Sequence, residues 1–204
     1  MTGSDAADVE RAEVLIKRAL AASSHGALAH YAKGQMLRRQ RRSEEAIPEF
    51  ETVLALNRNS VSAMVALRWC KLLTGSIEES LPLAEQATRL SYRDPLSATW
   101  YHLIGTAHLL QSRTDEAIVW LQRARSANPE LPYAHSHLAS AYALRGEIEH
   151  AAAELAQARR LSGDRRFSSI AQLEAAQYFG VPEIRTLYET TLFAGLRKAG
   201  MPEG

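Results

Sequence analysis

The stretch ATWYHLIGTAHLLQSRTDEAIVWLQRARSANP, residues 98–129, decides the fold. Apolar residues recur at intervals of three and four on both sides of its polar middle, which is the period of amphipathic helices. Gly105 in the first half and Ala117 and Ala124 in the second are small residues at positions where two packed helices approach closely. The stretch therefore predicts two antiparallel helices joined by a short turn.

The same arrangement recurs along the chain with a spacing of 34 residues, interrupted once. The set Gly105, Ala117 and Leu121 has counterparts at Gly34, Ala46 and Phe50, at Arg68, Ser80 and Ala84, and at Ala139, Ala151 and Leu155. The interruption adds three residues around SYRDP, residues 91–95, where a loop can absorb them. Self-similarity at such a period indicates a repeat architecture in which each unit packs on its neighbours.

The repeats predict an all-α fold, a right-handed superhelical solenoid of antiparallel helix pairs. We expect four units, at 27–60, 61–97, 98–131 and 132–165. Residues 1–26 predict a lone helix that corresponds to the second helix of a truncated preceding unit. Residues 166–204 predict capping helices and a tail, in which the amphipathic stretch 183–200 closes the array.

The turns between paired helices are rich in charge. Ser43, Ser76 and Thr114 each precede acidic residues and are predicted to cap the second helix of their unit.

Four arginines, Arg38, Arg39, Arg41 and Arg42, end the first helix of the first unit and fill its turn. We interpret them as a solvated joint between helices, with Arg38 and Arg39 remaining as candidates for an acidic partner segment. Arg41 takes the turn position that a glycine holds in the second and fourth units.

Composition argues against several classes of function. The chain has 204 residues with 24 Lys+Arg against 23 Asp+Glu, so its near-neutral charge gives no general attraction to nucleic acid or to anionic membranes. Cys70 is the single cysteine, which excludes a disulfide framework and a CxxC metal site. No apolar run is long enough to span a membrane, and we expect a cytoplasmic protein.

No catalytic signature is present, so we expect a non-enzymatic chain without a cofactor, a catalytic residue or a metal site. The sequence contains no GxSxG, no Gly-rich phosphate loop and no HExxH. His135 and His137 point about 200° apart on a helix and cannot share a metal. His102 and His137, in successive units, are the remaining pair to weigh, and solvated or hydrogen-bonded histidines are the favoured alternative.

The spacing of small residues resembles the tetratricopeptide repeat, which has a small residue at position 8, Ala at 20 and 27, and Pro at 32. Residues 98–129 match most of this pattern, through Gly105, Ala117, Ala124 and Pro129. The resemblance implies a concave groove that is lined by the first helices and binds a peptide or protein segment.

Transferring the groove positions of this repeat onto the chain gives a candidate partner-binding site. Its residues are Tyr31, Gln35, Arg38, Arg39, Val65, Trp69, His102, Thr106, Tyr133, Ser136, His137 and Ser140. The lysine and asparagine with which chaperone-binding members grip a terminal carboxylate are absent from the corresponding positions. An aromatic, histidine and apolar groove with arginines at one end is what remains, although Trp69 could equally be a core residue.

Three phrases are similar to a narrower family. NRNSVSAM at 57–64, RLSYRDPLSATW at 89–100 and LFAGLRKAGMPEG at 192–204 resemble the C-terminal repeat region of bacterial proteins that carry a class III adenylate/guanylate cyclase or a winged-helix domain. The resemblance implies a regulatory region of a multidomain signalling protein.

The function expected from these observations is a non-catalytic protein-interaction module. Two alternatives remain open, a homodimerisation module for an upstream domain and a small-ligand sensor that uses the groove.

Overall fold

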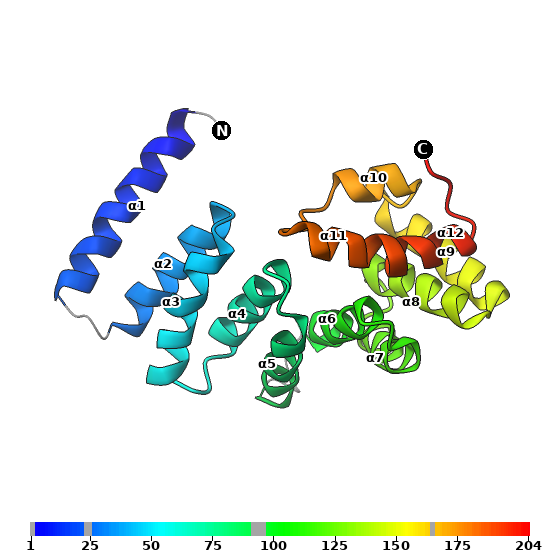
Figure 1. Cartoon of the computed structure of the whole chain (residues 1–204), viewed down its shortest axis with the longest axis horizontal. Helices are drawn as coiled ribbons and strands as arrows, with labels where there is room; N and C mark the ends of the chain where they lie inside the picture. The colour runs from blue at the N-terminus through cyan, green and yellow to red at the C-terminus, as the bar shows by residue number, and fades with distance from the viewer. Residues whose placement is uncertain (1–2, 23–25, 91–96, 164–165) are drawn as a thin grey trace. The chain divides into compact units, whose positions relative to one another are not determined.

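The computed structural model describes residues 3–22, 26–90, 97–163 and 166–204, and these residues form an all-α fold (Figure 1). No strand occurs within these ranges. The prediction of an all-α fold of antiparallel helix pairs is confirmed. None of the helices in the described ranges is both long enough and apolar enough to cross a membrane. The chain divides into two compact units, Met1–Leu90 and Ser91–Gly204, and each is described by itself.

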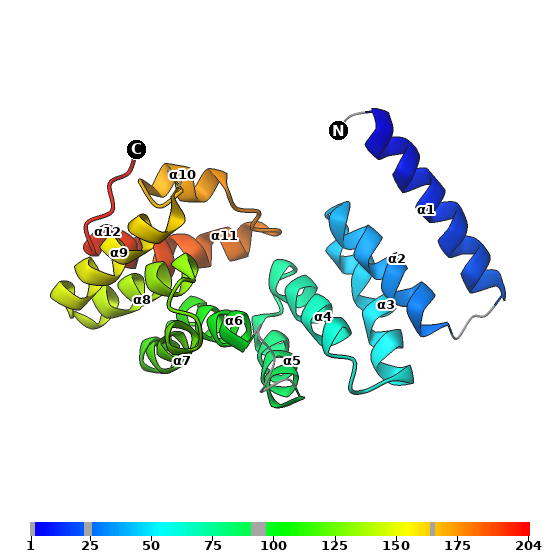
Figure 2. The ribbon, with the colours of Figure 1, turned by 180° about the vertical axis from the view of Figure 1, so that it is seen from behind.

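The first unit is a row of helices that pack on their sequence neighbours. Helix α1 (Gly3–Ala22) lies on α2 (Ala27–Arg39), α2 pairs with α3 (Ser43–Leu56), and α4 (Val61–Leu73) pairs with α5 (Ile77–Leu90). Helix α3 also packs on α4, which joins the two pairs. The order is visible in Figures 1 and 2 as the blue to green helices.

Apolar side chains from α2, α3 and α4 build the core of this unit. Phe50 and Ala46 from α3 meet Leu37 from α2 and Cys70 from α4, and all four are buried. These are the residues that the helical period places on one face of each helix. Burial raises the pKa of the Cys70 thiol, so this cysteine is a protonated core residue.

The second unit contains two further helix pairs. Helix α6 (Ser97–Leu110) pairs with α7 (Thr114–Ala127), and α8 (Pro132–Arg145) pairs with α9 (Ile148–Ser162). Their shared core contains Ile104, Leu121, Leu138 and Leu155, each no more than 2% exposed.

A C-terminal group of short helices completes the second unit. It contains α10 (Ile170–Ala175), α11 (Pro182–Tyr188), a π-helical turn η1 (Glu189–Phe193) and α12 (Ala194–Lys198). Helices α11, η1 and α12 follow one another as one rod, drawn in orange and red, which runs over α8 (Figures 1 and 2). The sequence predicts this rod as a cap, and the structure shows that it also covers the face of a first helix.

Two of the predicted helix caps are wrong. Helix α3 begins at Ser43 and α7 at Thr114, so the cap positions fall on Arg42 and Arg113, neither of which makes a side-chain cap bond. The carbonyl oxygen of each arginine instead accepts the first intrahelical bond, from the amides of Ala46 and Ala117.

One turn position has the same left-handed backbone in all four helix pairs. The φ angles are 62° at Arg41, 90° at Gly75, 59° at Ser112 and 93° at Gly146. The turn geometry is therefore shared, and Arg41 adopts the conformation for which glycine is the favoured residue.

The predicted insertion at 91–95 lies outside the described residues. The boundaries of the four predicted units, the second of which ends at residue 97, stay a prediction.

Candidate partner-binding face

Six of the predicted site residues lie on α2 and α4 in the first unit. We call the surface that they form the α2–α4 face, and its members are Tyr31, Gln35, Arg38, Arg39, Val65 and Trp69. Arg39 is exposed and the other five are half-buried, as expected for side chains that line a surface while resting on a core.

A row of hydrogen bonds orders the α2 side of this face. The Gln35 Nε2 amide donates to the Tyr31 hydroxyl at 2.6 Å, and Arg38 Nε donates to Gln35 Oε1 at 3.0 Å. The Tyr31 ring packs edge-on against Phe50, with ring centroids 5.8 Å apart. Because Tyr31 packs on the buried Phe50 ring, the polar row is connected to the core of the unit.

In the described part of the chain, the positive charge of this face is not neutralised by an ion pair. Among the described residues, no carboxylate pairs with Arg38 or Arg39. Arg42 differs, because Glu45 accepts a hydrogen bond from its Nε at 2.6 Å and raises the pKa of its guanidinium. Arg38 and Arg39 therefore stay candidates for contact with an acidic partner segment, a prediction that the structure does not test.

The α4 side of the face is apolar and aromatic. Val65 and Trp69 lie one turn apart, and the guanidinium carbon of Arg68 is 6.0 Å from the centre of the Trp69 ring. Arg68 itself is 1% exposed, so Val65 and Trp69 are the accessible side chains here, and tryptophan is enriched at interaction hot spots.

The other predicted site residues lie in the second unit, where an aromatic cluster joins α6 and α8. The His102 ring lies 4.5 Å from the His137 ring and 6.0 Å from the Tyr133 ring, between centroids. The Thr106 hydroxyl donates to the His102 carbonyl at 2.8 Å. Burial lowers the pKa of His137 to about 4, so this histidine is neutral at physiological pH.

This cluster does not assemble a metal site with other ligands. In the described part of the chain, no group of three or more His, Cys, Asp or Glu side chains could hold a metal ion.

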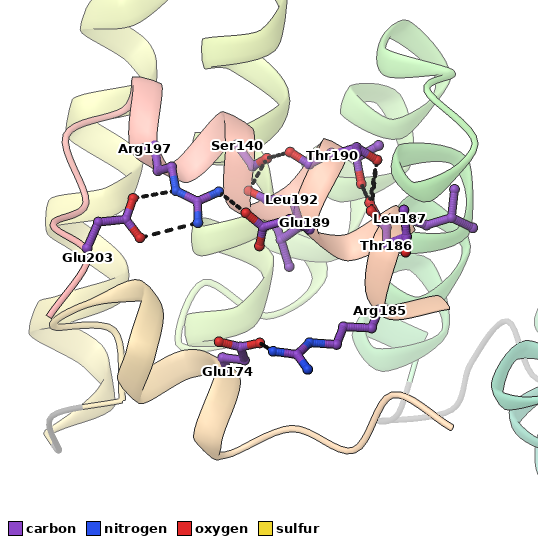
Figure 3. A network of polar contacts seen from close by, with 11 residues as sticks. Ser140, Glu174, Arg185, Thr186, Leu187, Glu189, Thr190, Leu192, Arg197 and Glu203 are labelled. Carbon is purple, nitrogen blue, oxygen red and sulfur yellow. Dashed lines mark hydrogen bonds and ion pairs between the residues drawn. The ribbon is translucent and has the colours of Figure 1, made fainter. Parts of the chain in front are cut away.

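The second unit covers its own predicted groove. Ser136 and Ser140 are 0% exposed and His137 is 3% exposed. The Ser140 hydroxyl donates to the carbonyl oxygen of Leu192 in η1 at 2.9 Å (Figure 3). Helix α12 packs on α8, and η1 contacts both α8 and α6. These three residues were expected to line an open groove, but all of them are buried, and Ser140 contacts the chain's own C-terminal rod.

Ion pairs connect the parts of the C-terminal group: Arg197 links α12 to η1 and to the tail, and Arg185 links α11 to α10. Arg197 Nη1 lies 2.6 Å from a Glu189 carboxylate oxygen, and Arg197 Nε donates to Glu203 at 2.5 Å (Figure 3). The hydrogen bonds to Glu203 and Glu189 raise the pKa of Arg197 above its usual value. Arg185 of α11 pairs with Glu174 of α10 at 2.5 Å.

The tail is fixed by backbone bonds as well. The amides of Ile170 and Ala171 donate to the carbonyls of Pro202 and Glu203, each at 2.9 Å.

The sequence did not reveal Leu192 and Gly195 as members of this surface. A Cβ added to Gly195 would lie 2.2 Å from Ser140 Oγ and 2.5 Å from the Ser140 carbonyl oxygen, so only glycine permits the observed approach. The signal that could have indicated it is the pair of serines on α8, one turn apart at two groove positions, together with a glycine inside an otherwise apolar helix.

Successive antiparallel helix pairs, each packed on its neighbour within a unit, are typical of helical repeat proteins. A family model described as Tetratricopeptide repeat matches residues 4–61 and 74–132, which is more than half of the chain. The chain therefore belongs to the tetratricopeptide repeat family. No curated protein matched the chain.

Solved structures share the fold at low sequence identity. The MamA RS-1 ArsTM double mutant is 21% identical with a TM-score of 0.71, covering 78% of this chain and 88% of its own. PilF from Pseudomonas aeruginosa is 16% identical with a TM-score of 0.70, and the match covers 91% of this chain and 82% of PilF.

YrrB, described as a tetratricopeptide repeat protein with an unusual peptide-binding site, is 16% identical with a TM-score of 0.62. The match covers 85% of this chain and 89% of YrrB. At these identities the likeness concerns the fold alone.

Proposed function

We propose that this chain is a non-catalytic protein-interaction module that binds a segment of another polypeptide on its α2–α4 face. The observation that carries the proposal is the contrast between the two units. The α2–α4 face keeps Arg39 exposed and its other members half-buried, whereas Ser136, His137 and Ser140 are buried, with Ser140 bonded to η1.

The chemistry of the face favours an acidic partner with an apolar anchor. Arg38 and Arg39 lack a carboxylate partner in the described residues, and Trp69 and Val65 offer an apolar surface on α4, which contacts α2. A segment that places an aspartate or glutamate near an aliphatic or aromatic side chain would satisfy both requirements. YrrB, described as having a peptide-binding site, supports binding of a peptide by this fold.

Peptide-array capture by the full chain and two substituted chains tests the assignment. We expect Arg38→Glu and Trp69→Ala each to reduce capture of the bound peptides at least tenfold, because each removes a central contact. Arg58→Glu, a charge reversal at an exposed residue outside the face, and Trp120→Ala in α7 are the matched controls and should leave capture unchanged. Unchanged capture by both face variants would refute the assignment.

Self-association is a second candidate, favoured by the apolar surface of α1. Val14 and Leu15, which are adjacent on α1, are 44% and 63% exposed. Light scattering on the purified chain would give a dimer mass if this surface joins two copies. A mass of one chain at high concentration would exclude the candidate.

The wider context that we propose is a regulatory region in the cytoplasm, within a bacterial multidomain signalling protein of the adenylate/guanylate cyclase type. The sequence phrases at 57–64, 89–100 and 192–204 support it. The reading frame upstream of residue 1 tests it, because a catalytic or DNA-binding domain encoded there would identify the parent, and a frame without either would contradict the proposal.

A further inference from the structure

The C-terminal rod lies on the surface of the second unit that is equivalent to the α2–α4 face of the first. Gln35, Trp69, Thr106 and Ser140 occupy one position of the repeat, 34, 37 and 34 residues apart. In the second unit this position is buried, and Ser140 contacts the rod directly. The rod therefore sits where a bound partner is proposed to sit in the first unit.

Ser140 contacts the rod through a backbone carbonyl oxygen, which lies in the π-helical turn η1. The amide of Ala194 donates to the carbonyl of Glu189, five residues earlier, which makes this turn π-helical. Where the backbone hydrogen bonds of a helix change from a five-residue to a four-residue spacing, one carbonyl oxygen is left without an amide partner inside the helix. Such π-helical turns are frequent at functional sites. The Ser140 hydroxyl donates to a carbonyl of this turn, that of Leu192, at 2.9 Å.

Gly195 sets the register of the rod on α8. Its missing side chain allows the rod to approach Ser140 so closely that a Cβ would lie within 2.5 Å of a backbone oxygen. Sliding the rod by one turn would bring a larger side chain to the same place. The fit is therefore specific to a helix with a small residue at this point.

Apolar side chains on both sides of Gly195 anchor the rod. Leu192, Phe193 and Leu196 are each no more than 1% exposed. Phe179, in the link before α11, adds a ring 5.2 Å from Tyr188 and 6.1 Å from Phe193. Ala176 and Tyr178 in the same link are exposed, so the rod joins α10 through a solvent-accessible connection.

We propose that residues 178–204 are an internal ligand that occupies a helix-binding site on α6 and α8. A partner helix of the same chemistry, with a small residue flanked by leucine and phenylalanine, competes with it for this site. The proposal rests on the proposed function in treating the faces of first helices as receptor surfaces. It goes further by naming the class of ligand, an amphipathic helix, and an internal competitor.

Cutting the exposed link in the folded full chain tests whether the segment is a ligand. A protease site inserted between Gln177 and Tyr178 is cleaved after folding, and the probe is a fluorescein-labelled synthetic peptide of residues 178–204. We expect the two parts to copurify after cleavage and the labelled peptide to replace the cleaved segment, with unlabelled peptide competing. The same peptide with Gly195→Leu should fail to exchange.

The matched pair of chain variants is Ser140→Ala and Ser126→Ala. Loss of one hydrogen bond of about 1 kcal/mol corresponds to roughly fivefold weaker retention of the peptide in Ser140→Ala. Ser126 is exposed in α7, so its replacement should change nothing.

Three results would overturn the proposal. If the cleaved segment leaves and the remainder loses its helical signal, the segment is a core element and not a ligand. If no label enters below the denaturant concentration that unfolds the unit, the site is not exchangeable. If the Gly195→Leu peptide enters as well as the unmodified one, the register argument is wrong. None of these results depends on the α2–α4 face, so failure here is distinguishable from failure of the proposed function.

Discussion

Replacing Gly195 by alanine adds one methyl group at the closest approach between two helices. The new carbon would lie 2.2 Å from Ser140 Oγ and 2.5 Å from the Ser140 carbonyl oxygen. The hydroxyl can rotate away, but the carbonyl belongs to the backbone of α8 and cannot. The rod therefore has to shift, which lengthens the Ser140–Leu192 hydrogen bond of 2.9 Å and loosens the buried side chains around it.

Two opposing terms determine how Gly195→Ala is expected to change the free energy of unfolding. Overpacking of a well-packed site costs about 1–3 kcal/mol, and a clash with backbone belongs at the upper end. Alanine in place of glycine inside a helix contributes about 1 kcal/mol in the other direction. We expect a net loss of about 2 kcal/mol, since the steric term exceeds the propensity term.

Urea unfolding followed by circular dichroism measures this loss, and Ala152→Gly at an exposed position of α9 calibrates the propensity term separately. Adding Ser140→Ala to Gly195→Ala removes the nearer contact and leaves the carbonyl contact, so it should recover part of the loss and no more. If Gly195→Ala stabilises the chain by the amount that Ala152→Gly destabilises it, the close approach in the structure is wrong.

Further predictions concern the core, the turn and the buried histidine. Phe50→Ala should lower the free energy of unfolding by about 3–5 kcal/mol, because the Phe50 side chain is fully buried. Val119→Ala, at an exposed position, should change it by less than about 0.5 kcal/mol. Equal effects of the two substitutions in urea unfolding would contradict the assigned core. Arg41→Gly should stabilise the first unit by about 1 kcal/mol, because glycine adopts a φ of 62° without strain, and a lower urea midpoint would refute this. Burial lowers the pKa of His137 to about 4 from 6.5, so the unfolded chain binds the proton first as the pH falls. The stability contributed by neutral His137 is therefore complete above pH 6.5 and is lost between pH 6.5 and about 4, by up to about 3 kcal/mol. His137→Gln should flatten this part of the plot of urea midpoint against pH. An unchanged plot would exclude His137 as the cause.

The sequence predicted the helix pairs well because their signals are local. The helical period around Phe50 and Leu121 and the small residues at Gly34 and Gly105 are properties of short stretches, and the repeat multiplies them. Ser43 and Thr114 were misplaced by one position, because a capping residue and a first helical residue have similar preferences.

The covering of the second unit could not be predicted in the same way. The serines at 136 and 140 indicate a close approach at α8, but they do not show that residues near 192 make it, since the contact spans more than fifty positions of sequence. The amphipathic period of residues 183–200 predicts that one side is buried, but does not say against which surface. The π-helical turn is also set by the packing and has no simple sequence signal.

Photo-cross-linking tests the central claim most directly, that the chain binds a partner through the α2–α4 face. A photoreactive phenylalanine analogue replaces Gln35 in one chain and Val119, which is 47% exposed on α7, in another, and each chain is irradiated with a peptide selected on the array. The account predicts a cross-linked peptide at position 35 and none at position 119. Cross-linking at position 119 with none at position 35 would contradict it.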